Sequence, residues 1–312
     1  AGDTILDDEY NTFVNNSSNP YGYNHFAGPG SGVYGLNQST ISTVSAGGTI
    51  NASSWNSLFT GLDNISNHTN VSITASSVSA GDTVAIRAAL VSDLANLAAA
   101  VAGGSTSATA LSDRSAGSST NGNTWNSTST IERSITFANN NTMRAYFNAG
   151  GTIKINPGTS GSVSGSKDTV FQQLEAAVGT LEFKAHATTR SGSGETQTTF
   201  NSGTGFHDLS TGYSTLLKLT SNNSGYTSDT LTISAKLNAA VSSATVITIK
   251  SVASDPAADT TYTSGNLSGV PSNPNEAPAM SLALTAKEPT AAQGLASAIQ
   301  FSSNAQVSNS AS

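Results

Sequence analysis

Between residues 125 and 285 the sequence alternates apolar and polar residues over short runs, and this alternation constrains the fold more than any other feature. In one run, for example, Leu181, Phe183 and Ala185 are separated by polar residues. Short strands with one buried face, separated by turn-forming residues, are typical of antiparallel sandwiches. We therefore expect residues 125–287 to form an antiparallel β-sandwich or jelly-roll-like domain, and the whole chain to be mainly β with a few helices. The strands are expected at 131–137, 153–155, 181–185, 231–237, 246–249 and 280–284.

One helix is expected to interrupt these strands at residues 168–178. Asp168 can cap its N-terminus, and Gly179 can end it because glycine tolerates the left-handed conformation. Apolar residues recur between them at helical spacing, namely Val170, Phe171, Leu174 and Val178.

The pair Gly150-Gly151 separates two apolar runs in the segment FNAGGTIKI, residues 147–155. A phosphate-binding P-loop needs GxxxxGK followed by Ser or Thr, and a dinucleotide-binding fold needs GxGxxG between a strand and a helix. Neither pattern occurs here. Because Asn148 and both glycines tolerate positive φ, we expect a hairpin turn that joins two strands.

Two similar segments, VSAGGTI from Val44 and VSAGDTV from Val78, precede apolar stripes with helical spacing. Gly103-Gly104 can end the second stripe. A solenoid would need at least three copies of such a unit. Residues 41–104 are therefore expected to form a small helical region with two helices packed together. The stripes are Trp55, Leu58, Phe59, Leu62 and Ile65, and then Leu90, Val91, Leu94, Leu97 and Val101.

Three segments lack a regular period. Residues 1–40 are dense in turn formers, yet they carry aromatic residues for which a solvated tail has no use. We expect them to be an extended arm that lies on its own domain or on a neighbouring copy. Residues 105–124 are expected to be a polar linker, and residues 288–312 a C-terminal tail. The aromatic residues of the arm are Tyr21, Tyr23, Phe26 and Tyr34.

The arm begins with an acidic cluster. Its spacing does not match the calcium-binding loop of an EF-hand. A solvated terminus is the expectation, and ion binding there stays open. The cluster consists of Asp3, Asp7, Asp8 and Glu9.

Only 10% of the 312 residues are charged, against about 25% in a typical soluble domain. The surface must therefore consist largely of neutral hydroxyl and amide groups, which suits a protein that packs against copies of itself. A secreted or halotolerant soluble domain has the same composition. The net charge of −7 and the lack of Lys/Arg runs argue against nucleic acid binding. No apolar stretch approaches the roughly 20 residues of a membrane span, so we expect no membrane insertion.

The residues offer no catalytic constellation. Cysteine is absent, which removes thiolate catalysis and Cys-ligated metals. His207-Asp208 lies near many serines, but no GxSxG elbow occurs, and Ser193 lies in a Gly/Ser loop. We expect no catalytic residues, no cofactor and no metal. The histidines that could be weighed as zinc ligands are His25, His68, His186 and His207. The carboxylates that could be weighed as a glycosidase pair are Glu175, Glu182, Glu195, Asp208 and Asp229.

Several segments resemble structural proteins of marine cyanophages and related tailed phages. In that family a Val-x-x-Gly-x-x-Ile motif leads to an Ala-x-x-Trp-Asn-x-Leu helix that ends near a histidine. The segments ITFANNNTMRAYFNAGGTIKI (135–155), Gly179–Phe183 and GFHDLST (205–211) are similar as well, and so is the helix start at Lys167-Asp168. The chain departs from the family at Lys154, where arginine is common, and at Pro157, where a Ser-rich stretch is usual. The motif positions here are Val44, Gly47, Ile50, Ala52, Trp55, Asn56, Leu58 and His68.

The resemblance implies a non-enzymatic virion protein of the tail or its fibres. We expect it to assemble through its arm and tail into a homo-oligomer, with other virion proteins as further partners. It would be made in the host cytoplasm and reside in the virion. The alternative is a fibre or adhesin module that binds a host surface glycan or another receptor. The resemblance assigns no functional residues.

Overall fold

The computed structural model describes residues 6–29, 35–82, 87–107, 110–122, 125–160, 166–256, 277–291 and 294–312. The chain divides into two compact units. The boundary expected within 105–124 lies at Asp113, but the chain also passes between the units at Phe137, Thr152, Ala286 and Gln300. Unit 1 contains residues 1–113, 138–152 and 287–300, and unit 2 contains residues 114–137, 153–286 and 301–312.

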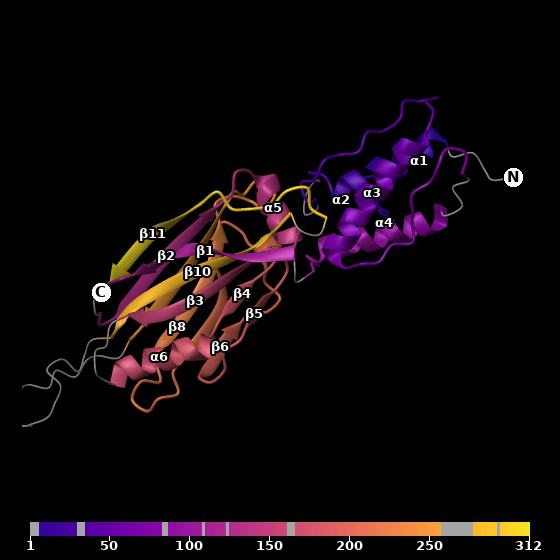
Figure 1. The fold of residues 1–312 in the computed structure, drawn as a ribbon. Helices are drawn as coiled ribbons and strands as arrows, with labels where there is room; N and C mark the ends of the chain where they lie inside the picture. Colours follow the sequence, from indigo (N-terminus) through magenta and orange to yellow (C-terminus); the bar gives the residue numbers. More distant parts are fainter. Residues whose placement is uncertain are drawn as a thin grey trace, which may run out of the picture. The chain divides into compact units, whose positions relative to one another are not determined.

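The strands form the antiparallel β-sandwich that the alternating pattern predicts (Figure 1). One sheet has five strands in the order β1-β10-β3-β4-β5, and the other has six in the order β11-β2-β9-β8-β7-β6. The strands are β1 (Leu111–Thr120), β2 (Thr128–Thr136), β3 (Thr152–Ser160), β4 (Leu181–Phe183), β5 (Thr188–Arg190), β6 (Thr196–Phe200), β7 (Ser214–Thr220), β8 (Thr230–Leu237), β9 (Val246–Ser254), β10 (Ala279–Pro289) and β11 (Ser303–Ala311).

The core of unit 2 is built from alternate residues of these strands. Ile135 of β2 lies opposite Ile247 of β9, and both are fully buried. The helix expected at 168–178 is α6 (Ser166–Val178), which packs against β7 and β8. It begins two residues earlier than expected, so Asp168 lies in its first turn and does not cap it. Gly179 follows the helix at φ +60°, as predicted.

The expected linker at 105–124 is wrong, because β1 occupies most of it. This strand is an edge of the five-stranded sheet, next to β10. Residues of β1 are mostly exposed or half-buried, and only Ala116 and Ser119 are buried. An edge strand is held by backbone hydrogen bonds along one side, so it does not need the alternation that identifies a half-buried strand.

The expected tail at 288–312 is also wrong. β10 continues to Pro289, and β11 pairs antiparallel with β2 at the edge of the six-stranded sheet (Figure 1). All nine residues of β11 are exposed. The Ala/Ser/Asn composition that resembles a loose tail is therefore that of a strand held by its backbone.

Unit 1 is mainly helical. The two helices expected in 41–104 are α3 and α4, and they pack against each other. The expectation of an extended arm is wrong for two stretches of residues 1–40, because they form α1 and α2, whereas the other described residues of this segment lie outside helices and strands. Tyr10, Phe13 and Val14 have the i, i+3, i+4 spacing of a helix face, and all three are buried. Tyr34 and Asp3 lie outside the described residues. The helices are α1 (Asp7–Asn15), α2 (Tyr23–Phe26), α3 (Ala52–Thr69), α4 (Arg87–Ala102) and α5 (Asn140–Asn148).

Three helices of unit 1 each carry an asparagine that holds an extended segment by its backbone, which we call an asparagine clamp. Its Nδ2 donates to the carbonyl oxygen of one residue, and its Oδ1 accepts the N–H of the same residue, at 2.8 to 2.9 Å. The amide thus replaces the two hydrogen bonds of a neighbouring strand. Each clamp follows a buried aromatic residue: Tyr10-Asn11 holds Val44, Tyr23-Asn24 holds Ile41, and Trp55-Asn56 holds Val78.

The expected hairpin at Gly150-Gly151 is wrong, because a helix, α5, precedes the glycine pair. Gly150 has φ +80°, its N–H donates to Phe147 O at 3.0 Å, and the N–H of Gly151 donates to Tyr146 O at 2.8 Å. This pair of hydrogen bonds is the Schellman motif that ends helices. A Cβ atom on Gly150 would also collide with Thr106. The glycines therefore end α5 and lead the chain into strand β3.

Among the described residues, no helix combines the length and the apolar character that crossing a bilayer requires.

Candidate functional site

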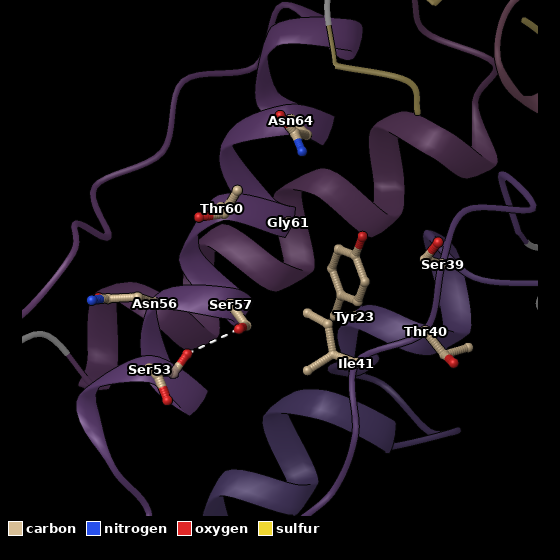
Figure 2. A pocket seen from close by; sticks show the side chains of 10 residues that line it. All are labelled: Tyr23, Ser39, Thr40, Ile41, Ser53, Asn56, Ser57, Thr60, Gly61 and Asn64. Atoms are coloured by element: carbon tan, nitrogen blue, oxygen red, sulfur yellow. Dashed lines mark hydrogen bonds between the residues drawn. The ribbon is translucent and has the colours of Figure 1, made fainter. Parts of the chain in front are cut away.

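A groove in unit 1 runs between α3 and the extended segment 39–42 (Figure 2). Its larger part has a volume of about 530 Å³ and the adjoining part about 350 Å³. Figure 2 shows the Tyr23 ring and the Ile41 side chain between helix and segment. Both parts are lined by Thr40, Ile41, Ser53 and Ser57, so they form one continuous groove.

One wall of the groove is a helix face that presents hydroxyl and amide groups. Ser53, Ser57, Thr60 and Asn64 follow the i, i+4, i+7, i+11 spacing that brings residues to one side of a helix. Ser39 and Thr40 lie on the opposite wall. The groove therefore places neutral polar groups on both sides of a small apolar floor.

Two local features fix the shape of the groove. Gly61 lets the Tyr23 ring approach the backbone of α3, since a Cβ atom there would lie only 2.7 Å from the ring. Asn24 clamps Ile41, which holds the second wall in an extended conformation. Both features consist of contacts within the chain, so the shape of the groove does not depend on a bound ligand.

The groove offers both hydrogen-bond donors and acceptors. The Ser57 hydroxyl donates to Ser53 O at 2.9 Å, and the Ser53 hydroxyl donates to Asn51 Oδ1 at 2.6 Å. Each hydroxyl has one proton, so these two present lone pairs to the groove. Thr60 and Asn64, by contrast, can each offer a hydrogen-bond donor as well as an acceptor. The described residues that line the groove include no charged side chain.

A second candidate surface is the side of the sandwich where both sheets end in long strands. β1 spans ten residues and β11 spans nine, whereas β5 and β6 at the other ends have three and five. Arg133 joins the two long edges, because it donates to Ala116 O of β1 at 3.1 Å and to Asn304 Oδ1 of β11 at 2.8 Å. Asn309 of β11 also donates to Thr120 O at 2.8 Å.

The middle residue of β11 is Val307, whose side chain is 53% exposed. It lies in a β-bulge, between the residues that pair with Arg133 and Glu132 of β2. The strand SNAQVSNSA contains neither a charge nor a proline, two of the devices that protect an edge from pairing, whereas the bulge at Val307 is a third such device and is present.

The structure brings two of the four histidines together. The rings of His186 and His207 are stacked, with centroids 4.6 Å apart. His25 stacks on Tyr21, and His68 is fully buried with Nε2 3.1 Å from Ala149 O. Burial lowers the pKa of His68, and the hydrogen bond to Ala149 offsets part of this effect. Within the described residues, no group of three or more His, Asp or Glu side chains could hold a metal ion.

Three of the carboxylates considered from the sequence have local contacts. Asp208 accepts the Gly205 N–H at 2.9 Å and so caps a short 3₁₀ helix. Glu195 accepts the backbone N–H of Asn222, and Glu182 lies 3.4 Å from Lys184. Asp229 is fully buried.

Glu175 has an unusual carboxyl group, since burial raises its pKa to about 7. Hydrogen bonds with Thr159 of β3 counteract this shift, and the charge of Asp168 adds to it. A carboxyl group with such a pKa can act as a general acid or base. The described contacts bring to it the hydroxyl group of Thr159 and the charge of Asp168.

The acidic residues at the N-terminus of the described chain also have a structural role. Asp7, Asp8 and Glu9 form the first turn of α1, where negative charge is favourable because of the helix dipole. Asp8 Oδ1 accepts the Glu9 N–H at 2.8 Å.

Sequence reasoning missed the groove and the long edges. A local signal for the groove was present, because an aromatic residue followed by asparagine occurs in Tyr10-Asn11, Tyr23-Asn24 and Trp55-Asn56. Each of these asparagines holds a segment 17 to 33 residues away. The sequence alone therefore does not show which segment each asparagine binds.

Comparisons of the chain with models of protein families, with curated proteins and with solved structures found no match.

Proposed function

We propose that this chain is a non-enzymatic structural protein of a tailed-phage virion, in the tail or its fibres, and that it assembles with copies of itself. The phage origin rests on the resemblance of the motifs around Val44, Trp55 and Gly150. The assembly role rests on one observation, the exposed Val307 in the middle of the uncharged edge strand β11.

Pairing of β11 with β11 of a second copy fits this strand. A two-fold axis that passes through Val307 would place this residue opposite Val307 of the second copy. The flanking residues are neutral and small or polar, so the approach brings no like charges together. The outer backbone edge of β11 then gains the hydrogen bonds that a lone edge lacks.

This mechanism replaces the arm and tail that the sequence suggests. The expected arm contains α1 and α2 of unit 1, and the expected tail contains β11. Contact between copies therefore relies on a folded edge and needs no exchange of loose ends.

The test is the oligomeric state of the full chain, measured by sedimentation and by size exclusion with light scattering. We expect a dimer or a larger assembly for the native chain. Val307→Lys places two lysines opposite each other at the two-fold axis and should yield monomers, since like charges directly opposite destabilise strand pairs. The matched control is Thr198→Lys, which adds the same charge at the middle of β6, the short edge of the same sheet.

Thr198→Lys should keep the native assembly. A native chain that stays monomeric at high concentration, or a control that dissociates as completely as Val307→Lys, would contradict the role of β11. The virion location is tested separately, by labelling purified phage particles with an antibody against the chain. Particles without label, from a phage that encodes the chain, would refute the virion part.

A further inference from the structure

We propose that Lys167 and Asp255 condense into an isopeptide bond, a covalent amide between their side chains, and that Asp229 carries the proton in this reaction. All three residues belong to unit 2. The reaction occurs once and within one chain, so it goes beyond assembly and does not depend on contact between copies. It converts a buried ion pair into a cross-link between α6 and the end of β9.

The two reacting groups are in contact inside the protein. Lys167 Nζ lies 2.5 Å from Asp255 Oδ2, and the two side chains are only 6% and 0% exposed. The backbone fixes both residues, since Lys167 lies in the first turn of α6 and the Asp255 N–H donates to Ser127 O at 2.9 Å. Groups held together in this way react as if their concentration were about 10⁵–10⁸ M.

Aromatic rings lie close to the ion pair. Phe171 follows Lys167 by one turn of α6, and its ring packs edge-to-face on that of Trp125, with centroids 4.9 Å apart. Trp125 precedes Ser127, the partner of the Asp255 backbone, by two residues. Taking two charges out of water costs free energy. A proton transfer that leaves a neutral amine and a neutral carboxyl group removes this cost, and the neutral amine is the nucleophile.

A second carboxyl group lies beside this pair. Leu231 of β8 lies opposite Ala253 of β9, and both residues are buried. Asp229 and Asp255 lie two residues farther toward the same end of the two strands, so they continue this buried face, and the same register places them opposite each other. Opposite residues have Cβ atoms about 4.5–5.5 Å apart. Asp229 is fully buried as well, and it is thus placed to exchange a proton with Lys167.

The reaction balances without an oxidant or a further reactant. The ammonium group of Lys167 first gives one proton to the Asp255 carboxylate, and the resulting amine attacks Cγ. Asp229 then accepts a second proton from the nitrogen and returns it to the leaving oxygen. The Cγ–Oδ bond breaks, its electron pair stays with that oxygen, and the oxygen leaves as water. The new Nζ–Cγ amide is uncharged, so burial favours the product over the ion pair.

The experiment is mass spectrometry of the denatured full chain. We expect the native chain to be lighter than its sequence by one water molecule. Trypsin should not cut after Lys167, and it should release residues 155–184 joined to residues 251–287 as one branched peptide. Lys167→Arg keeps the positive charge but removes the amine, so this variant should have the full mass of its sequence.

The matched control is Lys184→Arg. Lys184 also lies beside a carboxylate, 3.4 Å from Glu182, but both side chains are partly exposed. This variant should lose one water molecule as the native chain does. Asp255→Asn changes the leaving group, and it should lose the mass of ammonia in place of water.

Asp229→Asn should slow the appearance of the lighter chain by about 100- to 10,000-fold, the usual contribution of a general acid–base group. The rate is followed from the end of synthesis in a cell-free extract, with circular dichroism to show that the variant is folded. A native chain that keeps its full mass after prolonged incubation would show that the contact is an ion pair only, and would overturn the proposal. Loss of water that persists in Lys167→Arg would do the same. A folded Asp229→Asn chain that reacts at the native rate would refute the role of Asp229.

Discussion

Glu175 is a residue whose charge state affects how the stability of the fold responds to pH. It lies on α6 beside Thr159 of β3, and its pKa in the folded chain is about 7, against 4.5 for an ordinary carboxyl group. The folded state therefore binds this proton more tightly than the unfolded state does. Its contribution to stability is favourable below about pH 4.5 and falls as the pH rises toward 7.

We expect Glu175→Gln to be more stable than the native chain at pH 8, by at most about 3 kcal/mol. Glutamine is neutral at every pH, so the gain should vanish near pH 4. Thermal unfolding of both chains across this range measures the difference. Glu182→Gln is the control, because Glu182 forms a half-exposed pair with Lys184, and such pairs contribute little. A gain at pH 8 that persists unchanged at pH 4 would rule out titration of Glu175 as its cause.

At the scale of elements, the asparagine clamps replace strand pairing by side-chain contacts. A strand pair distributes its hydrogen bonds over many residues, whereas a clamp concentrates two of them on one amide. The segment at Ile41 should therefore depend strongly on Asn24.

We expect Asn24→Ala to leave the Ile41 N–H and C=O without their partners and to destabilise the fold by about 1–3 kcal/mol. Asn24→Asp keeps the acceptor for the Ile41 N–H and loses only the donor. Hydrogen exchange should thus show fast exchange at the Ile41 amide in Asn24→Ala and slower exchange in Asn24→Asp. The control Asn96→Ala changes an exposed asparagine of α4. Equal exchange of Ile41 in all four chains would mean that the clamp does not hold the segment.

How a strand or helix is buried decides whether the sequence could predict it. Strands β2, β8 and β9 were predictable because each buries one face, which imposes alternation. β11 was not, because all of its residues are exposed, and β1 was not, because its two buried residues, Ala116 and Ser119, do not alternate with exposed ones. α5 was predictable but was missed: Asn139 accepts the Thr142 N–H at 2.9 Å, a capping pattern at the residue where the helix begins. The apolar run after it has helical spacing, but the glycine pair suggested a hairpin.

At the scale of the molecule, the candidate sites are harder to predict than the sandwich. The groove needs Asn24 to hold Ile41 and needs Tyr23 to reach Gly61, contacts between residues distant in sequence. Exposed Val307 has meaning only once β11 is known to lie at an edge. The carboxylates of Asp208 and Glu195 accept backbone N–H groups of Gly205 and Asn222, contacts that the sequence does not reveal.

The path of the chain between the two units has a mechanical consequence. Most two-unit chains have one linker, and tension applied to them stretches that linker first. Here the backbone passes between the units at five points, after Asp113, Phe137, Thr152, Ala286 and Gln300. A force that pulls the units apart is therefore shared among these five backbone connections. In force spectroscopy, we expect no slack extension before the first rupture when the units are pulled apart, whereas a single soft linker would produce one. A part of a filament or fibre built this way would transmit a pull between its units without lengthening.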